Sequence, residues 1–343
     1  MPACKRLCQH CVYPGGLVVD NANSMVDVVR LAIGAFVNVE MWAMLTLNVF
    51  VLTCIIKGRL HKKKDNCVYI LAGFNICAEI CQLILHVIYV GPTIISGEWF
   101  FKGQDSLGVT IAATWFLGIW YLGSLVQILF ATNRFVVVCF PTRTFFTRSR
   151  VMGFIAICCC AALAMVTYSQ LLSPCCRITP DQRYFGYSYL VFNNLTINPS
   201  MYYVDLPLDI GTSSYCGISY IVLFVYVLKV GSHHSRSGKR EIRCCVQFML
   251  MFLTYTVTWL TFFLYPAIGI RAPEAYVVTT MVFMLNCGIN SIIYLVMNNE
   301  VRGAACRLLG KESLNALHAS QDKSGPSNRI KPTFTNAHYT SRR

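Results

Sequence analysis

Charged residues are scarce in this sequence, and acidic residues are scarcer than basic ones. Of the 343 residues, 13% are charged and 15 are Asp or Glu, whereas 55% are hydrophobic. Soluble domains carry about 25% charged residues, and one of this length could not bury so much apolar surface. The composition therefore excludes an ordinary soluble protein and indicates an integral membrane protein.

Several long stretches of the chain carry almost no charge. Seven of them are long enough to cross a bilayer, at about 20 residues per helical crossing. They show no ten-residue alternation of the kind found in transmembrane barrels, so each is expected to be a helix that satisfies its own backbone. The expected spans are residues 31–56, 67–90, 108–131, 151–172, 206–228, 244–270 and 276–297. The predicted fold class is an all-α membrane protein, with a bundle of seven transmembrane helices over residues 28–297.

Basic residues gather in alternate connections between the spans. The connections after spans one, three and five hold Lys57, Arg59, Lys62, Lys63, Lys64, Arg143, Arg148, Arg150, Lys229, Arg236, Lys239, Arg240 and Arg243. By the positive-inside rule these loops are cytosolic, which places residues 1–27 outside and the C-terminus inside. The net charge of +14 is then a topology signal and does not indicate nucleic-acid binding. Residues 1–27 lack the apolar core of a cleavable signal peptide, so span one is expected to act as its own insertion signal.

Other features on the expected outer side agree with this topology. Asn194 begins an N-glycosylation sequon in the long loop after span four. Five cysteines lie on the same side, where disulfides persist. They are Cys4, Cys8, Cys11, Cys175 and Cys176. One or two bridges from the N-terminal arm to the loop are expected, with open connectivity; zinc binding by the N-terminal cysteines is the alternative, although no His and Cys pair completes a ligand set.

The chain beyond span seven divides into two parts. In residues 298–310, Val301, Ala304 and Ala305 fall on one face, which predicts a short amphipathic helix on the inner membrane surface. Cys306 in this helix is either palmitoylated or a free thiol. Residues 311–343 are polar and rich in Ser and Thr, so we expect a disordered cytoplasmic tail that can accept phosphate and through it bind a kinase or an arrestin.

Polar side chains inside the spans are the candidates for function. Four carboxamides, Asn48, Asn75, Asn286 and Asn290, are expected to bond one another through water, as a static clamp or as part of a switch. Carboxyl groups in spans are rare without a function, and Glu79 and Glu40 were singled out on this ground. Arg134 follows a charge-free stretch from Ser106 to Asn133, where an always-ionised group is costly unless it has a role or reaches water.

Short motifs recur in the expected spans in a set order. Span one has Asn48 and Val51; span two has Leu71 and Asn75; span three ends TNRFVVVCFP; span six has Pro266 after an aromatic run; and span seven ends NSIIY. With seven spans and an outer N-terminus, these motifs resemble the rhodopsin-like G-protein-coupled receptors. The strings NRFVVVCFP, REIRCCVQF and INSIIYLVMNNEVR are most similar to the nematode serpentine chemosensory receptors, nearest the Srx or Srt type.

The resemblance implies an activation switch near the cytosolic face. Its residues would be Arg134, Asn133, Phe135, Pro141, Glu241, Pro266, Asn290 and Tyr294. Asn133 stands where the family has an acid beside the Arg, so Arg134 lacks that restraint, and Glu241 is expected to substitute. Asn75 replaces the Asp that holds sodium in many relatives, and Ser291 replaces a Pro, which puts the usual bend of span seven in doubt. Span three has no Cys at its outer end, so the usual disulfide of the family is missing.

The resemblance also implies a ligand pocket in the outer half of the bundle. Its expected lining is Glu79, Trp115, Phe116, Trp120, Tyr121, Trp259, Phe262, Tyr265 and Met281. Phe116 stands where amine receptors carry an Asp, and Met284 where opsins carry a Lys, which disfavours amines bound in that way and retinal. The aromatic lining suits a small, mostly apolar molecule or a short peptide end.

The resulting hypothesis is a chemosensory receptor in the plasma membrane that activates a heterotrimeric G protein. No cofactor, metal or enzymatic function is expected, because no nucleophile and base pair or metal cluster emerges in the spans. The alternatives are a seven-helix ligand-gated channel and a transporter. A transporter favours internal repeats and broken helices, which the sequence does not show.

Overall fold

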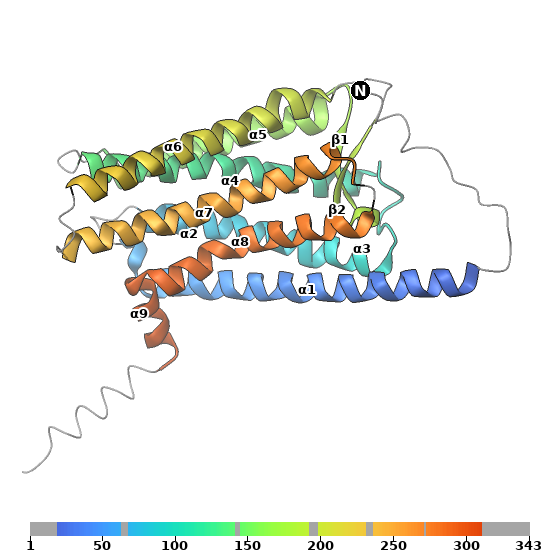
Figure 1. Cartoon of the computed structure of the whole chain (residues 1–343), viewed down its shortest axis with the longest axis horizontal. Helices are drawn as coiled ribbons and strands as arrows, with labels where there is room; N and C mark the ends of the chain where they lie inside the picture. Colours follow the sequence, from blue (N-terminus) through green and yellow to red (C-terminus); the bar gives the residue numbers. More distant parts are fainter. Residues whose placement is uncertain are drawn as a thin grey trace, which may run out of the picture.

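The fold is a bundle of membrane-spanning helices, closed at one end by a β-hairpin and flanked at the other by a short helix (Figure 1). The computed structural model describes residues 19–62, 68–140, 145–191, 198–230, 236–270 and 272–310. Seven of its helical stretches are long and apolar enough to cross a membrane. The predicted fold class is confirmed.

The helices follow the charge-poor stretches of the sequence and in places extend beyond the expected spans. They are α1 (Val19–Lys57), α2 (Val68–Leu85), α3 (Gly91–Ser96), α4 (Leu107–Cys139), α5 (Arg148–Thr167), α6 (Leu206–Val230), α7 (Arg236–Ala267), α8 (Val277–Met297) and α9 (Asn299–Leu308). Ser106, Thr147 and Asn298 cap α4, α5 and α9 with side-chain oxygens that accept backbone N–H groups. Because α4 continues to Cys139, Arg134 lies inside a helix rather than after it.

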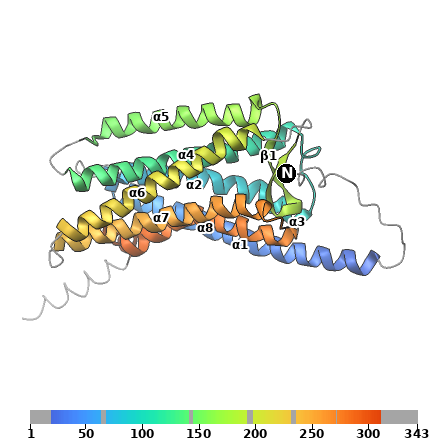
Figure 2. The same cartoon turned by 45° about the horizontal axis from the view of Figure 1, so that its top comes forward.

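The bundle has two ends, which we call the hairpin end and the α9 end (Figures 1 and 2). At the hairpin end, strands β1 (Arg177–Asp181) and β2 (Gly186–Leu190) pair antiparallel, with Ile178 opposite Tyr189. At the α9 end, the expected short helix is present, and it buries Val301, Ala304 and Ala305 in a cluster with α1 and α8. The hairpin and α9 therefore lie at opposite ends of the bundle.

Three spans contain a π-helical turn, and all three turns lie at the hairpin end. They are His86–Val90 between α2 and α3, Tyr168–Leu172 after α5, and Met201–Asp205 before α6. A π-helical turn widens the helix and rotates the following side chains, and such turns are frequent at functional sites. Here they direct polar groups toward the interior of the bundle beneath the hairpin.

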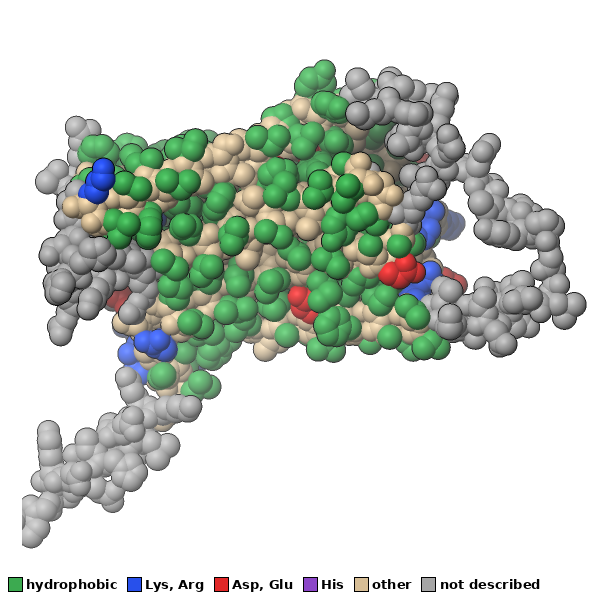
Figure 3. All heavy atoms as spheres, in the orientation of Figure 1, with side chains coloured by type: hydrophobic (Ala, Val, Ile, Leu, Met, Phe, Trp, Pro, Cys, Tyr) green, Lys and Arg blue, Asp and Glu red, His purple; other side chains and the backbone are tan. Residues whose placement is uncertain are grey.

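The distribution of side chains is that of a protein surrounded by lipid. Hydrophobic side chains cover the visible face along the length of the helices, and the visible Lys and Arg side chains gather toward the two ends (Figure 3). The interior instead contains buried polar residues, among them Asn48, Gln82, Gln127 and Asn290. Polar groups in such an interior need partners within the protein.

One interhelical contact illustrates this requirement. Asn48 on α1 is fully buried, and its amide donates to the carbonyl of Cys287 on α8 over 2.8 Å. The Ser291 hydroxyl, at the position where the rhodopsin-like pattern that the sequence resembles has Pro, donates to the Asn48 oxygen. The sequence change at position 291 therefore supplies a hydrogen bond between α1 and α8.

We expect Asn48→Leu to destabilise the bundle, because it removes both bonds and leaves the Ser291 hydroxyl buried. The expected loss is about 1 kcal/mol, or a fall of about 3 °C in the unfolding midpoint in nanodiscs. Thr53→Ala is the matched control, since the Thr53 hydroxyl bonds only to Val49 of its own exposed helix face. Equal midpoints for the two variants would contradict this account of the α1–α8 contact.

Candidate functional site

The polar site at the α9 end centres on Arg134. The guanidinium carbon of Arg134 on α4 lies 4.6 Å from the centre of the Phe248 ring on α7. Among the described residues no carboxylate forms a salt bridge with it, and its Nε is buried without a hydrogen-bond partner. A cation over an aromatic face is stabilised by about 1–2 kcal/mol when it is shielded from water. The described contact that holds Arg134 is therefore a ring on α7.

The neighbours of Arg134 do not restrain it as an acid would. Asn133 is 1% exposed, and within the described chain its Oδ1 has no hydrogen-bond partner. Phe135 instead packs against Phe140 at the end of α4. The phenols of Tyr69 on α2 and Tyr220 on α6 lie within the electrostatic reach of Arg134.

Several of the expected switch residues have a defined place and others do not. Tyr294 on α8 is buried in the cluster that joins α8 to α1 and α9. Glu241 and Pro266 belong to α7, but their side chains lie outside the described part of the structure, as does Pro141. The expectation that Glu241 takes the place of the acid missing beside Arg134 therefore remains a prediction.

A second polar site lies in the middle of the bundle around Glu79. The amides of Asn75 on α2 and Asn290 on α8 both donate to Glu79 Oε1, the former over 2.6 Å. These residues and Asn286 line a cavity of about 50 Å³. The four expected carboxamides thus separate into two groups, because Asn48 bonds to Cys287 and Ser291 rather than to the other three.

A third site, at the hairpin end, contains two carboxylates that the sequence analysis missed. Asp205 lies in the π-helical turn before α6 and Asp209 one turn further on, and they are 6% and 2% exposed. The Tyr121 hydroxyl donates to Asp205, and Trp120 Nε1 and the Tyr255 hydroxyl donate to Asp209 over 3.2 and 2.7 Å. The i, i+4 spacing of two acids at the start of the fifth apolar span was the available signal. Glu40 and Glu79 are therefore not the only acids in the described spans.

The hairpin contributes two tyrosines to this third site. Tyr189 on β2 donates to Asp205 Oδ2 over 2.8 Å. The ring of Tyr187 stacks on Phe116 with centroids 3.6 Å apart, and its hydroxyl lies 3.1 Å from His86 Nε2. Burial raises the pKa of both phenols well above the usual range, so both remain protonated at neutral pH. We call Asp205, Asp209, Tyr121, Tyr189 and Tyr255 the acid–tyrosine cluster.

The expected pocket lining is only partly gathered here. Phe116, Trp120, Tyr121, Phe262 and Met281 pack in or against the core beneath the hairpin. Trp115 is 46% exposed and donates to the Cys81 carbonyl of α2, and Trp259 donates to Ser213 of α6. Tyr265 contacts Tyr276 near the rim. Helical spacing alone did not distinguish aromatics that face the interior from those that face neighbouring helices.

The cysteines behave differently from expectation where they are described. Cys175 and Cys176 are bonded to each other, so neither is available for a bridge to the N-terminal arm. Adjacent thiols reach each other without any folding of the arm, which explains the difference. Cys4, Cys8, Cys11 and the sequon residue Asn194 lie outside the described residues. Cys306 is a free, partly exposed thiol on α9.

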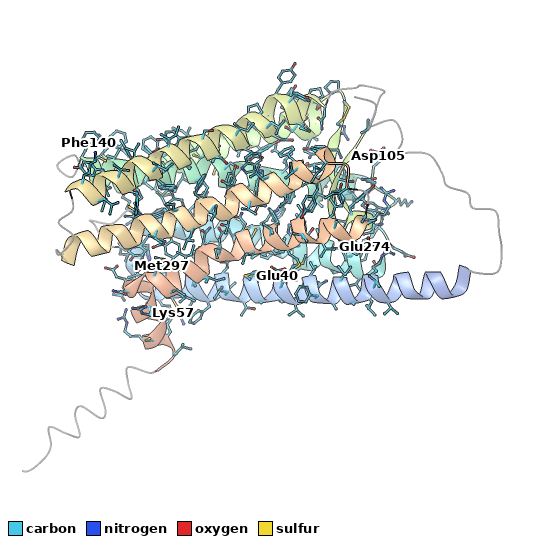
Figure 4. All side chains as sticks on the ribbon, in the orientation of Figure 1. Glu40, Lys57, Asp105, Phe140, Glu274 and Met297 are labelled. Atoms are coloured by element: carbon cyan, nitrogen blue, oxygen red, sulfur yellow. A yellow bond between two sulfur atoms is a disulfide. The ribbon has the colours of Figure 1, made fainter. Side chains whose placement is uncertain are left out.

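The two ends of the bundle differ in the residues that they present. Figure 4 shows Asp105 and Glu274 near the hairpin, Lys57 and Met297 near α9, and Glu40 part-way along α1. Seven apolar helices, buried acids beneath a hairpin at one end and Arg134 on the third span at the other end agree with the rhodopsin-like arrangement that the sequence resembles. The fold and the sites therefore define a G-protein-coupled receptor, and not an enzyme.

Comparison with known proteins identifies the family. Residues 45–298 match the family described as serpentine type 7TM GPCR chemoreceptor Srx, and this range is more than half of the chain. The chain belongs to this family. It is 23% identical over 319 residues to cannabinoid receptor 2 of Mus musculus, covering 83% of this chain and 84% of that receptor. It is also 23% identical over 286 residues to olfactory receptor 51F2 of Homo sapiens, covering 80% of each.

These findings confirm the sequence-based hypothesis at the level of class. The chain is a chemosensory G-protein-coupled receptor, a multi-pass protein of the plasma membrane that couples an extracellular ligand to a G protein. The alternatives of a channel and a transporter are not favoured, since the family and both relatives are receptors.

The contacts of Tyr187 lead to a prediction about the hairpin. We expect Phe116→Ala to loosen residues 177–190, because it removes the stacked ring that seats Tyr187. Hydrogen exchange of the hairpin amides should accelerate about tenfold, for a loss of roughly 1.4 kcal/mol of local stability. Phe145→Ala, an exposed ring at the α9 end, is the control. Unchanged exchange in the hairpin would show that the stack does not hold it.

Proposed function

We propose that this receptor binds a small, mostly apolar molecule beneath the hairpin and signals through release of Arg134 at the α9 end. The observation that carries the proposal is the contact between Arg134 and Phe248, which joins α4 to α7 without an acid. In this proposal the hairpin end faces outward and the α9 end faces the cytosol. The basic residues Lys57, Arg59 and Lys62 near the α9 end support that orientation.

The proposed switch works by moving a ring away from a charge. When α7 moves outward at its cytosolic end, Phe248 leaves the guanidinium, and Arg134 is then exposed in a cleft. Backbone carbonyls at the C-terminal end of a partner helix are suitable acceptors for it there. An agonist favours this state only by binding the open arrangement more tightly than the closed one.

The proposed ligand site is the chamber roofed by Tyr187 and Tyr189. Its lining combines aromatic rings such as Phe116, Trp120 and Phe283 with the buried acid–tyrosine cluster. Lining of this kind favours a ligand with an apolar body and a few polar groups. Since Tyr255 on α7 donates to Asp209 on α6, a ligand that alters this bond also alters how α7 packs.

The remaining assignments complete the proposal. Residues 1–27 are extracellular, Asn194 is glycosylated, and α9 lies on the cytosolic membrane surface with Cys306 available for palmitoylation. Residues 311–343 form a cytoplasmic tail that binds a kinase or an arrestin after activation, through the Ser and Thr residues it contains.

The first test removes the charge at the proposed switch. We expect Arg134→Ala to reach the cell surface at wild-type levels but to reduce G-protein dissociation at least tenfold across a ligand screen, because no cation remains to meet the partner. Arg150→Ala is the matched control, since Arg150 also lies over a ring, that of Phe145. A wild-type response from Arg134→Ala would refute the switch.

The second test changes the restraint on Arg134 while keeping its charge. Phe248→Leu should raise ligand-independent signalling about fivefold, since loss of about 1 kcal/mol from the closed state shifts the equilibrium by that factor. Phe248→Tyr retains the ring and should leave basal signalling unchanged. Asn133→Asp should lower it by adding an ionic partner. Basal signals that do not differ at matched surface expression would contradict the ring restraint.

A further inference from the structure

The cavity around Glu79 is lined by residues with buried polar atoms that have no hydrogen-bond partner in the described part of the chain. It lies among α2, α4, α7 and α8 and has a volume of about 50 Å³. Its polar lining is Asn75, Glu79, Gln82, Gln127, Asn286 and Asn290, and its aromatic lining is Trp120, Tyr255 and Phe283. The proposed switch does not use this space, and of the acid–tyrosine cluster only Tyr255 lines it.

Most of the unpaired polar atoms around the cavity are acceptors. Within the described chain, four buried oxygens lack any hydrogen-bond partner: Glu79 Oε2, Gln82 Oε1, Gln127 Oε1 and Asn290 Oδ1. Among the described residues that line the cavity, Gln82 Nε2 is the one buried donor that also lacks a hydrogen-bond partner. The residues that carry the three amide oxygens are 2%, 7% and 2% exposed. Buried acceptors without donors each cost about 1–3 kcal/mol, so a cavity that collects four of them is built for a donor.

The charge of the cavity is also uncompensated. Its lining contains one carboxyl and no Lys, Arg or His. Water alone can satisfy the amide oxygens, but if Glu79 ionises, the lining supplies no counter-charge for it. A cationic donor meets both requirements at once.

The apolar part of the lining determines which cation fits. Trp120, Tyr255 and Phe283 present aromatic surface, and Ala78, Ile119 and Cys287 present small apolar groups. Aromatic faces attract organic ammonium groups, and apolar groups accommodate a methyl or methylene. A volume of about 50 Å³ holds roughly four water-sized positions, enough for an ammonium nitrogen and a short alkyl stem. Among the described residues no group of three His, Cys, Asp or Glu side chains is placed to hold a metal ion.

We propose that this cavity binds a primary ammonium group on a short alkyl chain and recognises the cationic end of the ligand. The inference rests on the proposed ligand chamber, to which the cavity is joined: Trp120 and Tyr255 line the cavity, stack on each other, and both donate to Asp209. The ligand is then an amine whose N–H groups point to Glu79, Gln82 and Gln127. Its apolar body lies toward the hairpin, against rings that line the chamber.

This assignment differs from the amine site that the sequence excluded. Phe116 on α4 removes the carboxyl that amine receptors carry at that position, and the structure places Phe116 against Tyr187 of the hairpin. Glu79 on α2 supplies a carboxyl from another helix. The side chain of Gln82, one turn from Glu79, extends the same polar face of α2 toward the hairpin.

The test uses the full receptor in nanodiscs with methylammonium as the probe. At constant ionic strength, methylammonium should raise the unfolding midpoint saturably, by about 3 °C when the probe is at ten times its dissociation constant. Tetramethylammonium, which has no N–H and exceeds the cavity, and sodium should not raise it. A shift of the same size with sodium, or with tetramethylammonium, would overturn the assignment of an ammonium site.

Variants locate the effect. Glu79→Gln keeps the acceptor for Asn75 and Asn290 but removes the charge, and should weaken the methylammonium response at least tenfold in concentration. Gln127→Leu removes one unpaired oxygen and should weaken it less. Glu40→Gln is the matched control, because Glu40 is an acid on α1 outside the lining. An unchanged response in both cavity variants, or the absence of any response in the wild type, would reject the proposal.

This measurement is independent of signalling. If Arg134→Ala retained G-protein activation, the switch would fail while the methylammonium shift could still be present. If the shift were absent but Arg134→Ala were silent, the cavity assignment would fail and the proposed switch would stand.

Discussion

The structure depends on one constraint: inside a bilayer, a polar group has to find its partner within the protein. The receptor meets this constraint in three ways along its axis. At the hairpin end, Asp205 in the π-helical turn before α6 accepts from tyrosines on α4 and β2, and Asp209 on α6 accepts from a tyrosine on α7. In the middle, Glu79 accepts from two amides. At the α9 end, Arg134 lies on an aromatic face instead of beside an acid. Each arrangement joins different helices. The contacts that offset the free-energy cost of burying polar groups therefore also hold the helices together.

The three arrangements differ in how completely their polar groups are satisfied, and the proposed function depends on this difference. In the acid–tyrosine cluster, Asp205 and Asp209 accept hydrogen bonds from tyrosine hydroxyl groups. Within the described residues, the Glu79 cavity keeps several buried oxygens without a donor, and Arg134 keeps a buried Nε without an acceptor. Incomplete satisfaction is costly in a static protein but useful in a receptor, because a ligand or a partner can supply the missing group and so favour one state over another.

Much of the bundle could be predicted from sequence because charge-poor stretches of about 20 residues have one stable form in lipid. Arg134, Asn290 and Glu79 could be selected individually because ionisable and amide groups are rare in such stretches. Their partners could not. Nothing in the sequence near Arg134 points to Phe248, which is more than 100 positions away on α7. Asp205 was overlooked because it lies at the edge of an apolar stretch, and the π-helical turn that directs it inward has no sequence signature at this level.

The hairpin has a further consequence. Since Tyr187 and Tyr189 form hydrogen bonds with His86 and Asp205, β2 is both a wall and the cover of the proposed ligand site. Loop and helices are therefore not independent modules in this receptor. A substitution on β2 alters the space that the spans enclose, and a substitution at position 86 or 205 alters where the loop rests. Selectivity for a new ligand would have to arise in the two parts together, which limits how far exchange of loop sequences alone can diversify receptors built in this way.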